Sequence, residues 1–179
     1  LMESSQIIGA VIVARMKSSR LPGKSMVDIC GKPALEWLVE RIRLSNRIEK
    51  FTVATTTDPN DDVIENLAKK LGISCYRGSD TDVLGRVWNA AKISNIDIVV
   101  HVTGDCPLMD PRLVDQVIDL FVTSKSVDYA SLDPDSYPRG LDVEVFSVDG
   151  LSRVKAGFSI RGYANTLRSL FIACPTFLL

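Results

Sequence analysis

The sequence is poor in the residues that build metal clusters and crosslinks. Its 179 residues include one histidine, His101, and four cysteines, which stand far apart with no C-x-x-C pair. Scattered thiols with a single nitrogen ligand do not suit a zinc site. Unpaired thiols are typical of a reducing compartment. We therefore expect reduced cysteines and a cytoplasmic protein.

Long apolar runs and a strong excess of one charge are also missing. No stretch approaches the roughly 20 apolar residues that a membrane-spanning helix needs. Residues 1–6 lack the basic start and the apolar run of a signal peptide. The 21 Lys and Arg residues against 22 Asp and Glu give a formal net charge of -1. Since binding of nucleic acid relies on clustered positive charge, neither nucleic acid nor a membrane is an expected partner.

Apolar strands alternate with amphipathic helices along the chain. Residues 7–14 form a nearly unbroken apolar run, which is typical of a strand buried on both faces of a parallel sheet. The other predicted elements are strands at 51–55, 73–76, 97–103 and 127–131, and helices at 33–42, 58–71, 81–94 and 111–122. This alternation predicts an α/β protein with a mostly parallel sheet and helices on both sides, in the three-layer Rossmann-like class.

The loop after the first strand, residues 15–24, concentrates positive charge. Arg15, Arg20 and Lys24 are joined there by a further lysine. Guanidinium forks, ammonium groups and free backbone N–H groups are the donors that a triphosphate needs. Ligands of parallel sheets bind where loops leave the carboxyl ends of the strands. The loop is therefore a candidate phosphate site, with a solvated basic loop as the alternative.

The same loop ends in Gly23-Lys24-Ser25, which matches the tail of a P-loop motif. Two features argue against a P-loop. The motif requires glycine at the position of Ser18, and it must open a helix at once, whereas residues 26–33 separate Lys24 from the next predicted helix.

Several motifs taken together resemble one enzyme family. They are Ala14-Arg15-Met16-Lys17-Ser18-Ser19-Arg20-Leu21-Pro22-Gly23-Lys24, Gly31-Lys32-Pro33, Ala54-Thr55-Thr56-Thr57-Asp58, Gly78-Ser79-Asp80-Thr81-Asp82-Val83-Leu84-Gly85-Arg86, Thr103-Gly104-Asp105-Cys106-Pro107-Leu108 and Pro138-Arg139-Gly140-Leu141-Asp142-Val143-Glu144-Val145-Phe146. This ordered set resembles the cytidylyltransferases that include CMP-Kdo synthetases and acylneuraminate cytidylyltransferases. It looks closest to the branch that contains spore coat polysaccharide biosynthesis protein F.

The resemblance implies a nucleotide-diphospho-sugar transferase fold and a nucleotidyltransferase reaction. CMP would pass from CTP to a sugar with release of pyrophosphate, in polysaccharide or surface-glycan biosynthesis, with Mg²⁺ as the cofactor. The partners implied are a nucleoside triphosphate, with CTP favoured, and a sugar substrate.

The resemblance also implies a set of site residues. The nucleotide-binding residues are Ala14, Arg15, Ser19, Arg20, Lys24, Thr55, Thr56, Ser79, Asp82 and Arg86. Of these, Arg15 and Lys24 are expected to be catalytic because they would carry the charge of the triphosphate. Thr55 and Thr56 could read a pyrimidine edge or serve as ordinary turn residues. Asp82 could be no more than a first-turn acid that complements a helix dipole.

Asp105 stands at the end of a predicted buried strand, directly after Gly104. Its carboxylate is expected to point out of the sheet into the cleft. Such a hard ligand suits Mg²⁺, which takes one or two oxygens from protein and the rest from phosphate and water. We expect Asp105 to be a catalytic residue that binds the metal. The alternative is a turn aspartate that is hydrogen-bonded to its own backbone.

Asp142 and Glu144 alternate with valines, so on a strand both carboxylates share one face. They could bind sugar hydroxyls, or they could form a solvated strand face without a function. His101 is expected to be a packed side chain rather than the catalyst. Cys106 is not needed as a nucleophile, because a sugar hydroxyl can attack the α-phosphate directly.

The resemblance ends near residue 157. We expect a nucleotidyltransferase domain at 7–157 and a divergent tail at 158–179, which contains no acidic residue. The family pattern has a further segment that closes the sugar pocket and supports dimerisation, and none of it can be assigned to this tail. A natural ending, a frameshifted end and a truncation all stay open, as does a homodimer.

Two rival functions stay open as well. A glycosyltransferase that uses a finished nucleotide sugar usually shows an Asp-x-Asp metal motif, and Asp133-Pro134-Asp135 has that spacing but follows a different strand. The other rival is a nucleotide-binding protein that lacks turnover because its C-terminal part is missing.

Overall fold

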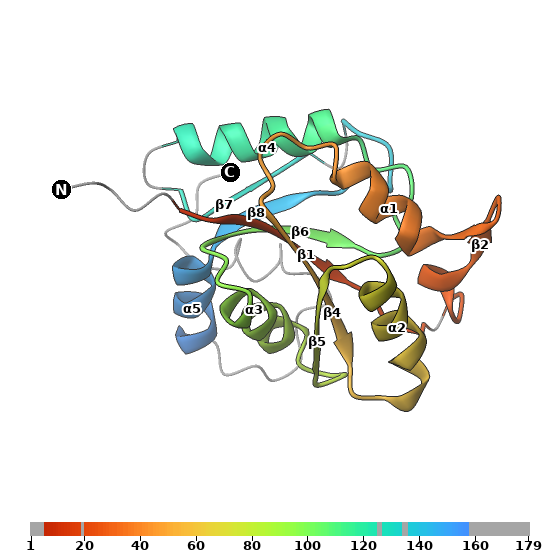
Figure 1. Ribbon diagram of the computed structural model, residues 1–179. Coiled ribbons are helices and arrows are strands. Elements are labelled where there is room, and N and C mark those ends of the chain that lie inside the picture. Colours follow the sequence, from red (N-terminus) through yellow and green to blue (C-terminus); the bar gives the residue numbers. More distant parts are fainter. Residues whose placement is uncertain (1–5, 19, 125–126, 134–135, 158–179) are drawn as a thin grey trace.

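The computed structural model describes residues 6–18, 20–124, 127–133 and 136–157. A six-stranded sheet with the strand order β5-β4-β1-β6-β8-β7 forms its centre (Figure 1). The strands are β1 (Ile8–Val13), β4 (Lys50–Thr56), β5 (Ser74–Gly78), β6 (Ile98–Thr103), β7 (Tyr129–Ser131) and β8 (Glu144–Ser147). Strand β1 pairs in parallel with β4 and β6, and β4 pairs in parallel with β5. Strand β8 runs antiparallel to both β6 and β7, so one edge of the sheet is antiparallel.

Helices cover both faces of the sheet. They are α1 (Ala34–Ile42), α2 (Asp62–Lys70), α3 (Val83–Ile93), α4 (Pro111–Thr123) and α5 (Val148–Gly157). Apolar residues of α1, α2 and α4 form one core with one face of the sheet, and those of α3 and α5 form a second core with the other face (Figure 1). In β1, Ala10 and Ile12 lie in the first core and Val11 lies in the second, because successive side chains alternate between faces. The predicted three-layer α/β fold is confirmed.

Aspartate side chains cap the helices that follow β5 and β6. Asp82 accepts a hydrogen bond from the backbone N–H of Gly85 at 2.7 Å at the start of α3. Asp110 accepts one from Arg112 at 2.9 Å before α4, whose first residue is Pro111. Caps of this kind contribute about 1 kcal/mol to helix stability, and proline is favoured in the first turn. These caps fix where the two loops end.

The chain between the loop at 15–24 and α1 does not form an α-helix. Its elements are η1, a 3₁₀ turn (Lys24–Met26), and a hairpin of β2 (Asp28–Ile29) and β3 (Lys32–Pro33). The hairpin turn places Cys30 and Gly31 at φ angles of 53° and 85°, and glycine adopts such angles without steric cost. Since α1 begins only at Ala34, the exclusion of a P-loop is confirmed.

The antiparallel edge is the part of the fold that the sequence pattern does not predict. Helix α5 has no counterpart among the predicted elements, and β8 lies between β6 and β7 rather than after them. Ser19 and the expected tail at 158–179 lie outside the described residues, and so does part of Asp133-Pro134-Asp135.

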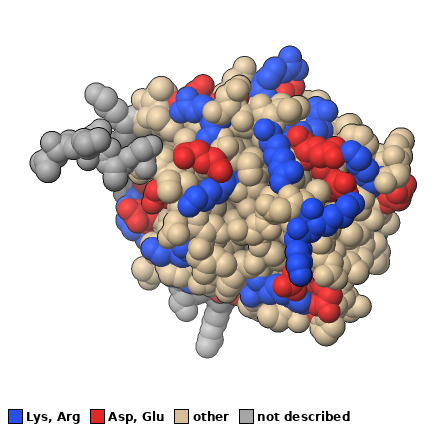
Figure 2. All heavy atoms as spheres, viewed as in Figure 1, with Lys and Arg blue, Asp and Glu red and all other residues tan. Residues whose placement is uncertain are grey.

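The surface seen in the same view mixes charges of both signs. Figure 2 shows Lys and Arg side chains interspersed with Asp and Glu over the described part of this face. The mixture fits the net charge of -1 and gives this face no extended positive area for a polyanion. Across the described ranges, no helix is both long enough and apolar enough to cross a membrane.

Candidate active site

The loops that follow β1 and β6 meet at the carboxyl edge of the sheet. Lys24 and Asp105 are 81 residues apart in the sequence, yet Nζ of Lys24 forms an ion pair with Oδ2 of Asp105. Their side chains are 31% and 29% exposed, so a ligand can reach both groups from solvent. The structure therefore joins two of the three residues that were predicted to be catalytic.

Gly104 allows this close approach. Its N–H donates to the carbonyl oxygen of Val13 at 2.9 Å, which continues the pairing of β1 with β6. A Cβ atom at position 104 would lie 2.8 Å from Cβ of Ala14 and 3.3 Å from Oγ of Ser25. A side chain there would push the opening loop away from Asp105. Ala14, a predicted nucleotide-binding residue, is itself buried, and its N–H donates to the carbonyl oxygen of Ala54 at 3.3 Å.

The carboxyl group of Asp105 is held in its charged form. Burial alone would raise its pKa, but the hydrogen bond and charge of Lys24, with a smaller effect of Thr103, hold the pKa below its ordinary value of 3.8. A charged carboxylate is the hard oxygen ligand that fits Mg²⁺. Within the part of the chain that the structure describes, no three His, Cys, Asp or Glu side chains gather into a metal site. Mg²⁺ would therefore need phosphate and water for most of its ligands here, as it does in many nucleotide sites.

Arg15 faces the loop that follows β5. Its Nη1 donates to Oδ1 of Asp80 at 2.5 Å, and the two side chains are 43% and 37% exposed. Arg15 and Lys24 therefore both hold an accessible carboxylate at the same edge of the sheet. Arg20, the third predicted cation, is exposed, whereas Ser19 lies outside the described residues.

The side chains of Thr55 and Thr56, at the end of β4, face the protein interior. Both are nearly fully buried, and their hydroxyls donate to Oδ2 of Asp61 at 3.0 Å and 2.5 Å. The chain folds back over the strand through η2 (Pro59–Asp61), a 3₁₀ turn that Asp58 caps by accepting from Asn60. Of the two readings of these threonines, the structural one accounts for the hydroxyls, because a buried carboxylate uses both of them; nucleotide binding by this segment stays a prediction. Sequence reasoning does not identify Asp61, whose partners lie at the end of β4 and on the loop that follows β1.

Arg86 lies inside the protein rather than on an open binding surface. It is 2% exposed, and its Nη1 donates to the carbonyl oxygen of Ser79. Burial lowers its pKa, and the positive charge of Arg15 adds to this effect. Oγ of Ser79 in turn accepts from the backbone N–H of Asp82 at 3.1 Å. These three predicted nucleotide-binding residues thus order the loop that presents Asp80, and the direct nucleotide contact expected of Arg86 is not provided by its buried guanidinium.

The carboxylate of Glu144 is hydrogen-bonded to side chains of the two neighbouring strands, β6 and β7. Its Oε2 lies 2.7 Å from Nδ1 of His101, and its Oε1 accepts from the hydroxyl of Tyr129 at 2.9 Å. His101 is 8% exposed, so the expectation of a packed side chain is confirmed. Asp142 is exposed, precedes β8 and accepts from the N–H of Gly140 at 3.2 Å. The expectation that Asp142 and Glu144 share one strand face is wrong, because the strand begins only at Glu144.

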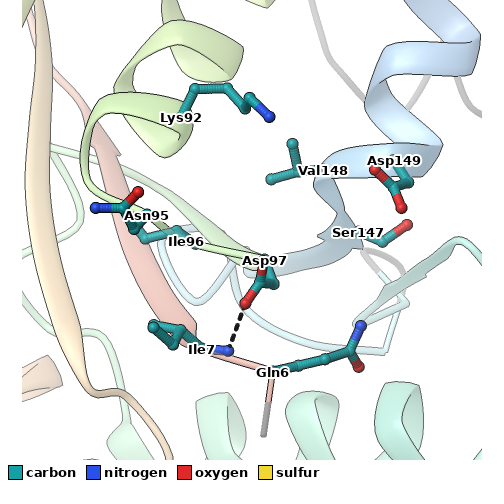
Figure 3. A pocket seen from close by; sticks show the side chains of 9 residues that line it. All are labelled: Gln6, Ile7, Lys92, Asn95, Ile96, Asp97, Ser147, Val148 and Asp149. Atoms are coloured by element: carbon teal, nitrogen blue, oxygen red, sulfur yellow. Dashed lines mark hydrogen bonds between the residues drawn. The ribbon is translucent and has the colours of Figure 1, made fainter. Parts of the chain in front are cut away.

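A separate cavity of about 220 Å³ lies at the opposite, amino edge of the parallel strands (Figure 3). Its walls come from the segments that precede β1 and β6, from the end of α3 and from the start of α5. Oδ2 of Asp97 accepts there from the N–H of Ile7 at 2.8 Å. None of the predicted site residues lines this cavity.

Taken together, the mostly parallel sheet, the cationic loop after β1 and the carboxylate at the end of β6 define a three-layer α/β protein with a charged site at the carboxyl edge of its parallel strands. The chain belongs to the cytidylyltransferase family, whose model matches residues 10–152.

Three curated relatives illustrate the match. An uncharacterised protein of Methanocaldococcus jannaschii is 36% identical over 148 residues, which are 83% of this chain and 59% of that protein. The 3-deoxy-manno-octulosonate cytidylyltransferase of Saccharophagus degradans is 40% identical over 108 residues, which cover 60% and 42%. Spore coat polysaccharide biosynthesis protein SpsF of Bacillus subtilis is 32% identical over 153 residues, which cover 82% and 62%. The chain thus spans less than two thirds of each of these relatives.

Two solved structures share the fold. A cytidylyltransferase from Leptospira borgpetersenii superposes with a TM-score of 0.82 at 36% identity, covering 87% of this chain and 66% of that one. A CMP:2-keto-3-deoxy-manno-octonic acid synthetase, solved in complex with CTP, superposes with a TM-score of 0.70 at 19% identity, covering 92% and 82%.

Proposed function

We propose that this chain forms the nucleotide-binding part of an enzyme that transfers CMP from CTP to a sugar and releases pyrophosphate. The observation that carries the proposal is the Lys24–Asp105 pair with Arg15 at the same sheet edge. A triphosphate needs the cations and its metal needs the carboxylate, so both requirements are met at one place. Membership of the cytidylyltransferase family supports CTP as the nucleotide.

In this reaction a sugar hydroxyl oxygen bonds to the α-phosphorus, and the bond from phosphorus to the pyrophosphate oxygen breaks. The hydroxyl proton passes to solvent water, and the pyrophosphate leaves with the electron pair of the broken bond. Lys24 would move from Asp105 to the phosphates, and Arg15 would move from Asp80. Both would then bind charge that grows on the leaving pyrophosphate. No covalent bond to the protein is needed, so positioning and electrostatics supply most of the rate.

Asp105, once Lys24 has left it, is the residue that would hold Mg²⁺. Bound to the nucleotide, the metal would neutralise charge at the α- and β-phosphates during pyrophosphate release. A substitution to Asn keeps the size of Asp105 and removes its charge. We expect Asp105→Asn to lose metal-dependent binding of the nucleotide, and unchanged metal-dependent binding and turnover would refute the assignment.

We further propose a sugar acid as the acceptor, for a polysaccharide or surface glycan. Support comes from the names of two relatives. One is a 3-deoxy-manno-octulosonate cytidylyltransferase, and the other is a spore coat polysaccharide biosynthesis protein. Because β8 runs antiparallel to β6, its first residues lie at the edge where β6 ends. Asp142 precedes that point and is exposed, so it is the better placed of the two carboxylates to meet a sugar.

Pyrophosphate release measured with CTP, UTP and GTP against a panel of acidic and neutral sugars tests the proposal. We expect release with CTP and an acidic sugar, and none with Asp105→Asn. Transfer of sugar from a finished nucleotide sugar would favour a glycosyltransferase instead. Mg²⁺-dependent CTP binding without release for any pair would favour a binding protein without turnover.

A further inference from the structure

The opening loop closes on itself at a narrow neck. The N–H of Gly23 donates to the carbonyl oxygen of Met16 at 2.7 Å. Gly23 has a φ of 72°, which a residue with a side chain adopts only with strain. Arg15 directly precedes the neck and Lys24 directly follows it. The position of this neck therefore sets the backbone positions from which the side chains of Arg15 and Lys24 extend.

One buried carboxylate fastens this neck to the sheet. Oδ1 of Asp61 accepts from the N–H of Met16 at 2.7 Å. Its Oδ2 accepts from the hydroxyls of Thr55 and Thr56 and from the N–H of Thr56 at 3.1 Å. The backbone of Met16 is thus held on one side by Gly23 and on the other by Asp61. The end of β4 and the neck of the loop share a single carboxylate.

The local structure does not require this arrangement. Asp61 stands at the N-cap position of α2, where an aspartate normally accepts from the first turn of its own helix, yet its side chain makes no such bond. Asp58, three residues earlier, does cap its turn. Asp61 is 1% exposed and forms no salt bridge within the described residues. Burying a carboxylate without a cation is costly unless hydrogen bonds satisfy it, so this diverted side chain indicates a role beyond the helix.

We propose that Asp61 is the positioning residue of the triphosphate site, which sets Arg15 and Lys24 by holding the N–H of Met16. The inference rests on the proposed function for its consequence in nucleotide binding. The hold on the neck itself is a property of the protein alone. Asp61 does not face the nucleotide, since it is buried and its oxygens are bound to protein donors.

Hydrogen exchange and CTP binding together test this role in three variants. Asp61→Asn keeps one acceptor oxygen, Asp61→Ala keeps none, and Asp58→Ala removes a cap in the same segment and serves as the control. We expect the amide exchange of Met16 and Gly23 to quicken at least tenfold in Asp61→Ala and less in Asp61→Asn. We expect the dissociation constant for CTP with Mg²⁺ to rise about tenfold in Asp61→Ala and less in Asp61→Asn. Asp58→Ala should change neither the exchange rates nor the dissociation constant.

Unchanged CTP affinity in an Asp61→Ala variant with fast exchange at Met16 would overturn the positioning role. Faster exchange over the whole chain would also overturn the positioning role, because that result is expected if Asp61 only stabilises the fold as a whole. If Asp61→Ala does not fold, Asp61→Asn supplies the same two measurements. If the natural protein binds CTP but releases no pyrophosphate with any sugar, the proposed function fails while the exchange and affinity data still decide the role of Asp61.

Discussion

The ammonium group of Lys24 is bound to the carboxylate of Asp105, although the proposed reaction needs the first on a phosphate and the second at a metal. Binding of the nucleotide to Lys24 would therefore free Asp105 for the metal, and binding of the metal to Asp105 would free Lys24 for the nucleotide. Nucleotide and metal should bind more tightly together than alone, and this coupling must be reciprocal.

Lys24→Met should tighten the binding of metal in the absence of nucleotide, because Asp105 loses its competing cation. The pair is about one third exposed and partly screened, so we expect roughly a threefold to tenfold gain. CTP binding should weaken in the same variant. Calorimetric titration with Mg²⁺ and then CTP measures both effects. Lys32→Met, which breaks an exposed pair with Glu40, is the control. Weaker metal binding in Lys24→Met would contradict the competition.

Asp80→Asn should improve nucleotide affinity, because Arg15 no longer has to leave a charged partner. Exposed pairs of this kind are worth about 0.2–1 kcal/mol, so the gain should not exceed about fivefold. The measurement is a CTP titration in low salt. Asp119→Asn removes a comparable exposed carboxylate from its pair with Arg47 and should leave the affinity unchanged. A loss of affinity in Asp80→Asn would show that Asp80 supports the nucleotide rather than competing with it.

Glu144→Ala should destabilise the protein far more than Asp142→Ala. Removing Glu144 takes an acceptor from the buried groups of His101 and Tyr129, and such a loss costs about 1–3 kcal/mol. Asp142 is exposed, so its removal should change the free energy of unfolding by less than about 0.5 kcal/mol. Urea unfolding compares the two variants. If Asp142 meets the sugar, its substitution should instead raise the KM for the sugar at unchanged stability.

Asp61 should make the protein sensitive to acid. Burial is the largest single influence and raises its pKa, but hydrogen bonds from Met16, Thr56 and Thr55 outweigh it and leave the pKa below 3.8. A carboxyl group with a lowered pKa stabilises the fold above its ordinary pKa, and this contribution is lost as the pH falls through the folded-state value. The stability difference between the natural protein and Asp61→Asn should be constant above about pH 5 and shrink below pH 3.8. Denaturant unfolding from pH 3 to 6 tests this, and a difference that grows in acid would contradict it.

Local patterns were enough to predict the parallel half of the fold. The apolar run before Arg15 and the proline-led start of α4 each reflect forces that act within one segment. Helix α5 and the position of β8 depend on pairing across the sheet, for which no short pattern exists. The order of strands at the antiparallel edge was therefore beyond reach.

The residues of the candidate site differ in the same way, since some could be predicted from local sequence and others depend on distant contacts. Lys24 and Asp105 could be predicted because charge after a buried strand has a direct chemical meaning at the edge of a parallel sheet. Asp61 could not, because the contact that links it to the site is a backbone N–H on a loop 45 residues away. The burial of Arg86 was missed for a similar reason, since an arginine in the first turn of a helix usually reaches solvent.

The neck between Met16 and Gly23 also has a consequence for how this loop can evolve. The hydrogen bond from Gly23 to Met16 joins the two ends of the stretch between them. Adding residues to such a closed loop costs little free energy, because the entropy of loop closure changes only with the logarithm of loop length. Lineages could therefore lengthen or shorten this stretch while Arg15 and Lys24 keep their starting points. Lys17 and Arg20 lie between the two ends, so such insertions and deletions would change how far these two cations reach.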